Sequence, residues 1–163
     1  IKGTSTAADA IIDLLANTES VTLGKKEYYA HAGFLRAGTM INSQIKNKII
    51  ELLNRKVINK IIVNGHSLGG GTAHMTGLIL YETLLNKKLI QQKEFSKFLI
   101  LGYAPGTTIA DKSKDGSLHT YIKNNKKLDI FNFINQQDMV PRLSMGNGIV
   151  LLAILTAIAM LFI

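Results

Sequence analysis

Cysteine and tryptophan are absent from the 163-residue sequence, and proline occurs only twice. Without cysteine the chain can have no disulfide framework, no thiolate metal site and no cysteine nucleophile. This absence favours a reducing, intracellular compartment. Hydrophobic residues make up 47% and charged residues 18% of the sequence, which excludes a disordered polar chain. We find no repeat or low-complexity linker and expect one folded unit.

Acidic residues are also scarce, with 11 against 19 basic ones, so the net charge is +8. A surplus of this size suits nucleic acid or an anionic membrane face. The lysines, however, are scattered among asparagine and isoleucine, without the interleaved aromatic side chains that single-strand binding needs. We therefore expect no nucleic-acid partner. We interpret the lysines as solvated faces, with weak attraction to acidic lipid as the alternative.

Long apolar runs are missing until the end of the sequence, where residues 149–163 are apolar apart from Thr156. As a helix this run would span about 22 Å, short of a hydrocarbon core of about 30 Å. Extending it back to Leu143 gives about 31 Å, but glycines weaken the added part. The sequence predicts residues 144–163 to be an apolar helix, either buried or in lipid, beside a domain of residues 1–143. It opens on Ile1 without a visible signal peptide, and both ends suggest a truncated chain.

Hydrophobic periodicity alternates between helix and strand along the chain. Helical spacing covers residues 5–15, 34–53 and 70–85, and short β-branched or aromatic runs at 60–64, 98–101 and 128–134 indicate strands. The inner face of the third helix is expected to carry Met75, Leu78, Ile79 and Leu85. Strands that alternate with helices imply crossover connections. The predicted fold class is therefore α/β with a mostly parallel sheet.

The most informative segment is G-x-S-x-G, formed by Gly65, His66, Ser67, Leu68 and Gly69. It follows a predicted strand and precedes a predicted helix, which is the setting of a nucleophile elbow. A serine in a strained turn needs neighbours without bulky side chains, and the two glycines meet this need. The helix that follows directs N–H groups and its positive dipole end toward an oxyanion formed there.

A serine nucleophile needs a base, and the base needs a carboxylate that orients it. Asp138 comes shortly after the third predicted strand, where such a carboxylate is expected. No histidine follows Asp138. Because none of the four histidines fits the usual chain order, we nominate none as the base, and each is expected to be a surface or partly buried residue: His31, His66, His74 and His119.

Four sequence blocks in order resemble the class 3, or fungal-lipase-like, lipases, and among them the sn-1-specific diacylglycerol lipases. The elbow continues as G-x-G-T-A, and a later turn reads Y-A-P-G; both are similar to the diacylglycerol branch. The blocks are I-K-G-T-S at residues 1–5, H-A-G-F at 31–34, G-H-S-L-G-G-G-T-A at 65–73 and D-M-V-P-R-L at 138–143. Two departures are Lys2 in place of the family's arginine and the lack of a histidine downstream of the last block.

The resemblance implies an α/β-hydrolase fold, incomplete here because the N-terminal strands and the histidine-bearing C-terminal part are missing. By position it implies that Ser67 is the nucleophile, that Asp138 orients the base and that the backbone N–H groups of Thr4 and Leu68 form the oxyanion hole. Loss of the histidine costs on the order of 10⁶ in kcat in serine hydrolases. The chain is therefore expected to be nearly inactive by itself.

These observations lead to two hypotheses about function. The first is a serine ester hydrolase acting on acylglycerols, diacylglycerol or triacylglycerol, through an acyl-enzyme at a membrane or lipid-droplet surface. The second is a non-catalytic, lipid-binding or membrane-tethered pseudo-hydrolase, favoured by the missing histidine and the apolar tail. Neither requires a cofactor, and calcium binding is possible in the family but is not evident from the sequence.

Overall fold

The computed structural model describes residue 1 and residues 17–112 and 117–135, which form two sheets and three helices. A parallel sheet in the order β3-β4-β6 comprises β3 (Lys60–His66), β4 (Lys97–Tyr103) and β6 (Leu128–Phe133). An antiparallel sheet in the order β1-β2-β5 comprises β1 (Thr18–Leu23), β2 (Lys26–His31) and β5 (Ile109–Asp111). The helices are α2 (Ala32–Asn54), α3 (Leu68–Asn86) and α4 (Ser117–Asn124).

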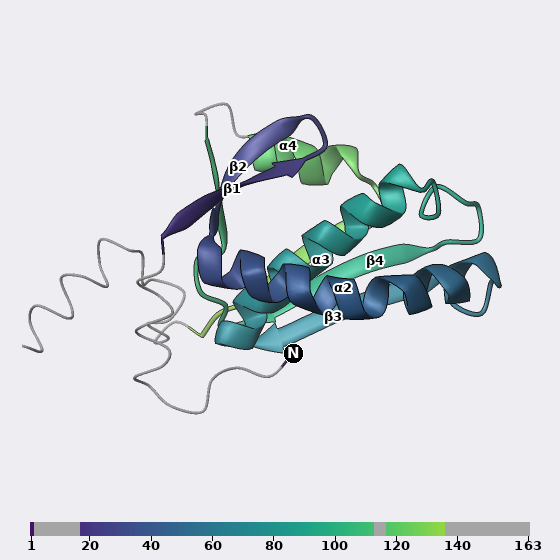
Figure 1. Ribbon diagram of the computed structural model, residues 1–163, viewed down its shortest axis with the longest axis horizontal. Coiled ribbons are helices and arrows are strands. Elements are labelled where there is room, and N and C mark those ends of the chain that lie inside the picture. The colour runs from purple at the N-terminus through teal and green to yellow at the C-terminus, as the bar shows by residue number, and fades with distance from the viewer. Residues whose placement is uncertain (2–16, 113–116, 136–163) are drawn as a thin grey trace, which may run out of the picture.

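The parallel sheet confirms the predicted α/β class, and each of its three strands lies where the β-branched or aromatic runs indicated. Helix α3 connects β3 to β4 and packs on both strands, while α2 packs along α3 (Figure 1). The antiparallel sheet was not predicted. Its first hairpin turns at Gly24, whose φ of 62° is the left-handed conformation that a two-residue hairpin turn requires.

The main core lies between α3 and the parallel sheet. Phe98, Ile100 and Leu128 point from the sheet toward Leu80 and Leu84 of the helix, and all five are at most 2% exposed. Alternate residues of each strand face this core, as the period of two requires. Burial on this scale, about 25 cal/mol per Å² of apolar surface, is the main force that holds helix and sheet together.

The prediction for the inner face of α3 is right in part. Met75 and Leu78 are fully buried, whereas Ile79 and Leu85 are only partly buried. Almost the whole first half of the helix, from Gly69 to Leu78, is buried because α2 covers the side that the sheet does not. The predicted helix at residues 5–15 and the apolar segment at 144–163 lie outside the described residues.

Small residues allow α2 and α3 to approach each other closely. A Cβ at Gly71 would lie 2.6 Å from the Phe34 ring, and one at Gly38 would lie 2.8 Å from the Thr76 nitrogen. The Asn42 amide also donates a hydrogen bond of 2.8 Å to the Thr76 carbonyl oxygen. This tight contact fixes the direction of α3, and with it the position of the residue that precedes the helix.

Candidate active site

Ser67 lies between the last residue of β3 and the first residue of α3, as predicted for a nucleophile elbow. Its φ of 54° and ψ of −126° belong to neither element and are rare for a residue with a side chain. Such a conformation costs of order 1–3 kcal/mol and persists only where the surroundings impose it. The serine side chain makes no hydrogen bond to the helix N-terminus and is half-buried.

Backbone hydrogen bonds on both sides of Ser67 impose this conformation. Its N–H donates to the Tyr103 carbonyl oxygen at 2.8 Å, which extends the β3–β4 ladder by one residue. Its own carbonyl oxygen accepts from Gly70 N–H at 2.8 Å and from Gly71 N–H at 3.2 Å. The peptide groups of Ser67 are thus used to hold the turn, and the hydroxyl is left for other partners.

The two glycines of the motif have a steric role that the structure makes explicit for Gly65. A Cβ there would lie 2.0 Å from the Gly69 carbonyl oxygen and 2.8 Å from the Gly70 nitrogen, far inside van der Waals contact. The strand and the helix therefore approach each other most closely at Gly65, and Ser67 lies in the turn between them. A Cβ at Gly70 would lie 3.1 Å from Cβ of Pro105, so the loop after β4 also packs against the elbow.

The Leu68 amide adjoins Ser67 at the N-terminus of α3. Leu68 is the first residue of α3, so its N–H has no acceptor within the helix, and it adjoins Ser67. A 19-residue helix adds a positive dipole end at the same point. A free backbone donor and a helix N-terminus beside a serine hydroxyl together favour the development of negative charge on an ester oxygen.

The neighbouring loops begin at the same edge of the sheet. Ala104 follows β4, has an unusual φ of 48° and donates its N–H to the Phe133 carbonyl oxygen at 2.8 Å. The ladder therefore continues one residue beyond β4, as it does beyond β3. Ile134 and Asn135 follow β6 at the same edge of the sheet, with β4 between them and the elbow. Residues that follow each of the three strands thus start from fixed positions around Ser67.

None of the histidines in the described part of the chain hydrogen-bonds the Ser67 hydroxyl. His31 precedes α2 and packs on Phe34 with 4.5 Å between ring centroids. His66 ends β3 and His119 lies on α4, and both are exposed. His74 is seven residues beyond Ser67 on α3, about 10 Å along the helix axis. His31 and His74 are both buried, so the expectation of surface or partly buried histidines is wrong for these two.

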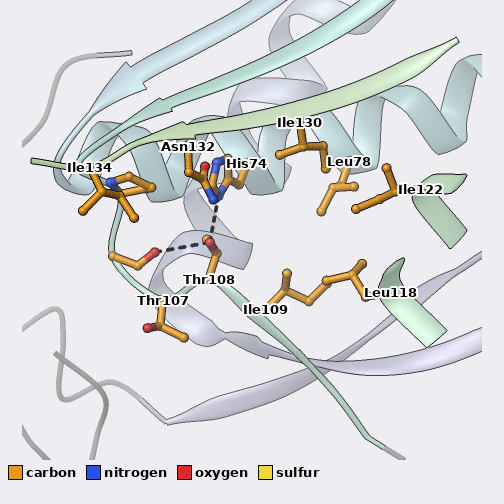
Figure 2. A pocket seen from close by; sticks show the side chains of 12 residues that line it. His74, Leu78, Thr107, Thr108, Ile109, Leu118, Ile122, Ile130, Asn132 and Ile134 are labelled. Atoms are coloured by element: carbon orange, nitrogen blue, oxygen red, sulfur yellow. Dashed lines mark hydrogen bonds between the residues drawn. The ribbon is translucent and has the colours of Figure 1, made fainter. Parts of the chain in front are cut away.

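His74 is buried, and one of its ring nitrogens is fixed by Thr108. The two atoms Nδ1 and Oγ1 are 2.9 Å apart, and the Thr108 hydroxyl also lies 3.3 Å from the Gly106 carbonyl oxygen (Figure 2). Because a carbonyl oxygen only accepts, the hydroxyl donates to Gly106 and accepts from Nδ1–H of His74. Burial lowers the pKa of His74, and the neighbouring Asn132 side chain opposes this shift in part.

A cavity of about 380 Å³ adjoins His74 on the helix side of the parallel sheet. Figure 2 shows that α3, the loop after β4, α4 and β6 each contribute to its wall. Most of the lining is aliphatic: Leu78, Ile109, Leu118, Ile122, Ile130 and Ile134. Pro105, which packs against Gly70 of the elbow, also lines the cavity, but Ser67 does not.

Comparison with known proteins identifies the family. The sequence profile described as Lipase (class 3) matches residues 1–148. The chain belongs to the class 3 lipase family. The four sequence blocks that resembled this family all lie within the matched range.

Individual lipases are similar to this class 3 lipase chain in sequence and in fold. A lipase of Rhizopus niveus is 31% identical over 101 residues, which are 62% of this chain and 25% of that protein. The crystal structure of the Rhizopus microsporus var. chinensis lipase superposes with a TM-score of 0.63 at 21% identity, covering 87% of this chain and 45% of that one. A triacylglycerol lipase whose catalytic centre is described as a serine protease triad gives a TM-score of 0.62 at 20% identity, covering 86% and 48%.

These matches show the fold and also how much of each relative's length this chain covers. The chain spans under half of the two solved lipases and a quarter of the Rhizopus niveus protein. The partial coverage agrees with the prediction of an incomplete α/β-hydrolase fold.

Two predicted site residues, Thr4 and Asp138, lie outside the described residues. The others occupy the turn from β3 to α3: Gly65, His66, Ser67, Leu68 and Gly69. Sequence reasoning did not assign a site role to Ala104, Pro105 or Thr108, which support the elbow and His74 from the neighbouring loop. The turn residues at 102–106 were a usable signal for that loop, but not for its contacts.

Among the described residues no group of acidic or histidine side chains is arranged to hold a metal ion. Within the same residues no helix combines the length and hydrophobicity needed to cross a bilayer.

Proposed function

We propose that this chain contributes the nucleophile and part of the oxyanion hole of a serine ester hydrolase that acts on acylglycerols. The observation that carries the proposal is the elbow: Ser67 at a φ of 54° between β3 and α3, with the Leu68 amide beside it. Membership of the class 3 lipases supports an acylglycerol ester as the substrate.

In the proposed reaction the Ser67 hydroxyl loses its proton to a base and attacks the ester carbonyl carbon. The carbonyl oxygen becomes an oxyanion, which accepts hydrogen bonds from the Leu68 and Thr4 backbone N–H groups. Collapse of this intermediate expels the alcohol, which takes the proton from the base, and leaves an acyl-Ser67 ester that water hydrolyses. Removal of one oxyanion donor typically costs about 2.7–4 kcal/mol of transition-state stabilisation.

Chain connectivity supports the roles proposed for Thr4 and Asp138. The Ile1 ammonium group donates to the Asn64 carbonyl oxygen at 2.6 Å, three residues before Ser67. Thr4 is three residues from Ile1 and therefore at most about 11 Å away from it. Asp138 is likewise three residues beyond Asn135, which leaves the sheet at the same edge as Ser67. Both residues can therefore reach the elbow.

The finer assignments remain part of this proposal. The G-x-G-T-A and Y-A-P-G segments favour diacylglycerol over triacylglycerol as the substrate. A lipid-droplet or membrane surface is the proposed location of the substrate, inside the cell. The base is proposed to come from outside residues 1–163. As an isolated chain these residues should retain only the acceleration of about 10³–10⁴ over water that binding and the oxyanion hole provide.

A fluorophosphonate probe tests the proposal, because it reacts covalently with activated serine hydroxyls. The probe is applied to the complete gene product that contains these residues, and the labelled peptide is identified by mass spectrometry. We expect labelling at Ser67, abolished in Ser67→Ala and retained in Ser43→Ala, a control in the exposed part of α2. Hydrolysis rates for diacylglycerol and triacylglycerol emulsions then decide the preferred substrate. An unlabelled Ser67 in a folded protein would reject the nucleophile assignment.

A non-catalytic lipid-binding protein is the second candidate function. It is favoured by one observation, that no described histidine hydrogen-bonds the Ser67 hydroxyl. This candidate predicts that the chain floats with liposomes equally well in the wild type and in Ser67→Ala. It also predicts no probe labelling in the complete gene product.

A further inference from the structure

The net positive charge of the chain is concentrated at one end of the parallel sheet. Three connections lead from a helix to a strand there: residues 54–60 from α2 to β3, 86–97 from α3 to β4 and 124–128 from α4 to β6. From the last helical residue to the first strand residue, they contain nine basic residues and one acidic residue, Glu94. Their charge of +8 equals that of the whole chain, so all other residues together are neutral. We call these three connections the basic end.

The basic end is one continuous surface. Lys60 and Lys97 are register partners in β3 and β4, and Lys97 Nζ donates to the Lys126 carbonyl oxygen at 3.0 Å. The Lys127 carbonyl oxygen accepts from Phe98 N–H at 2.7 Å. In Figure 1 the connections that follow α2 and α3 lie together at the end of the sheet opposite to the start of α3. The basic residues are therefore placed to act on one ligand.

Most of this charge has no acidic partner among the described residues. Glu51, Glu94 and Asp129 each pair with one basic residue of this end, at 2.7–3.0 Å. Six lysines there form no ion pair with a described residue: Lys60, Lys87, Lys88, Lys93, Lys126 and Lys127. Helix C-termini favour nearby basic side chains, which accounts for Lys87 and Lys88 after α3 but not for the four lysines that precede strands. Lysine is rarely buried without a partner, so this surface faces solvent or an acidic partner.

A small hollow opens within the basic end. Its volume is about 240 Å³, and it lies between the connections that precede β3 and β4. Among the residues that line it, Leu53 and Phe95 are 4% and 3% exposed, whereas Val57 is 59% exposed. Lys56 and Glu94, which form an ion pair of 2.8 Å, lie beside these apolar side chains. The hollow therefore offers apolar contact to one side chain inside a charged rim.

We propose that the basic end binds an acidic polypeptide segment, which places one apolar side chain in the hollow. The Asp and Glu side chains of such a segment pair with the six lysines that lack an ion pair. Charge complementarity of this kind speeds association and fixes the register of the bound segment. Lysine suits carboxylates of variable position, because its ammonium group is a point charge without the fixed fork geometry of arginine. The hollow adds the buried anchor around which a specific interface is built.

Two other anionic partners fit the basic end less well. Single-stranded nucleic acid stacks its bases on aromatic side chains, and Phe95, the aromatic residue of these connections, is 3% exposed. An anionic membrane would attract the lysines but leave the hollow empty. It would also direct Ser67 away from the lipid, because β3 separates Lys60 from Ser67 by about 23 Å. The membrane step alone rests on the proposed function.

Peptide binding to the complete gene product tests the proposal. The probe is a fluorescent synthetic peptide with Asp and Glu on both sides of one Phe, and fluorescence anisotropy measures its dissociation constant. We expect saturable binding that weakens about ten-fold when Ala replaces this Phe, because the apolar contact in the hollow is lost. Binding should also weaken as salt rises from about 0.01 to about 0.1 M, since the Debye length falls from about 30 to about 10 Å.

Paired lysine substitutions locate the binding surface. Lys60→Gln combined with Lys93→Gln should weaken binding about three- to ten-fold, as expected for two lost charge contacts at an exposed surface. The matched control, Lys25→Gln combined with Lys46→Gln, removes the same charge from exposed positions outside the basic end. It should change the dissociation constant by less than about two-fold.

A substitution at the hollow tests the anchor. Val57→Glu should lower the affinity of the Phe peptide to that of the Ala peptide, because a carboxylate then stands in the hollow. Met40→Glu, at an equally exposed position on α2, should leave binding unchanged.

Equal losses in the two lysine pairs, or equal affinities of the Phe and Ala peptides, would overturn the proposal. Flotation on vesicles of anionic lipid that is lost in Lys60→Gln with Lys93→Gln, without peptide binding, would do the same and would assign the basic end to a membrane. Ser67→Ala should bind the peptide as the wild type does, so failure here is distinct from failure of the nucleophile assignment.

Discussion

The substitution Gly65→Ala gives a demanding test of the elbow because the fold offers no space for a methyl group. The new Cβ would lie 2.0 Å from the Gly69 carbonyl oxygen and 2.3 Å from its carbon, where ordinary contacts are 3.4–4 Å. Neither atom belongs to a side chain that can rotate away, so the strand and the helix must separate. Overpacking typically costs about 1–3 kcal/mol, and the purely backbone clash places this variant at the upper end.

Thermal unfolding of the full chain, followed by circular dichroism, measures this cost. For a domain of this size about 3 kcal/mol corresponds to a melting temperature lower by roughly 6–12 °C. Gly33→Ala is the matched control, because its Cβ would meet the His31 ring at 3.3 Å, and α2 gains helix propensity. We expect the control to melt within about 3 °C of the wild type. If Gly65→Ala had the same melting temperature as Gly33→Ala, the close approach of β3 and α3 at Gly65 would be refuted.

Three further predictions concern strain, packing and protonation. Ser67→Gly should raise the free energy of unfolding in urea by about 1–2 kcal/mol, because glycine adopts a positive φ without strain, whereas Ser67→Ala should not. Gly102→Ala should lower it by about 1–3 kcal/mol, since the Cβ would lie 2.6 Å from His74 Nε2 and 2.9 Å from Pro105 Cγ; an unchanged urea midpoint would contradict this packing. Folding lowers the pKa of His74, so as the pH falls the unfolded chain takes up this proton before the folded chain does. The free energy of unfolding should therefore fall as the pH drops below about 6.5, by up to about 1.4 kcal/mol per pH unit. His74→Gln should reduce this slope between pH 6.5 and 5, and an identical slope would exclude His74 as its source.

The strand, the elbow and the following helix could be predicted because each depends on local chemistry. Ile61, Ile62 and Val63 are β-branched and favour an extended chain. The glycines beside Ser67 permit the tight turn, and the helix that follows forms despite four glycines because most of its first half is buried. A short segment of sequence therefore contained the information, and the structure agrees with it over residues 60–86.

The pairing of β2 with β5 in the antiparallel sheet escaped prediction because it is not local. β2 pairs with β5 across about 80 residues, through Tyr28 with Asp111 and Ala30 with Ile109. Each strand is short, and only Leu23, Tyr28 and Ala30 among the β1 and β2 residues are fully buried apolar side chains. An alternation of so few residues carries little signal.

The burial of His74 could not be foreseen for a related reason. Its ring occupies the space beside Gly102, which has no side chain and lies on the neighbouring strand β4. The hydrogen bond to Thr108 comes from a loop 34 residues away. Nothing within one helical turn of His74 indicates either contact, so helical periodicity alone could only place it on α3.

The positive φ angles of Ser67 and Ala104 have a common cause that bears on function. Each residue follows a strand of the parallel sheet and donates its N–H to a carbonyl of the next strand, at Tyr103 and Phe133 respectively. The sheet therefore sets both turns through the backbone and without the serine hydroxyl. It follows that Ser67→Ala should leave the positions of the elbow and of the Leu68 amide unchanged. Loss of probe labelling in that variant would then report the missing nucleophile alone, and not a displaced oxyanion donor.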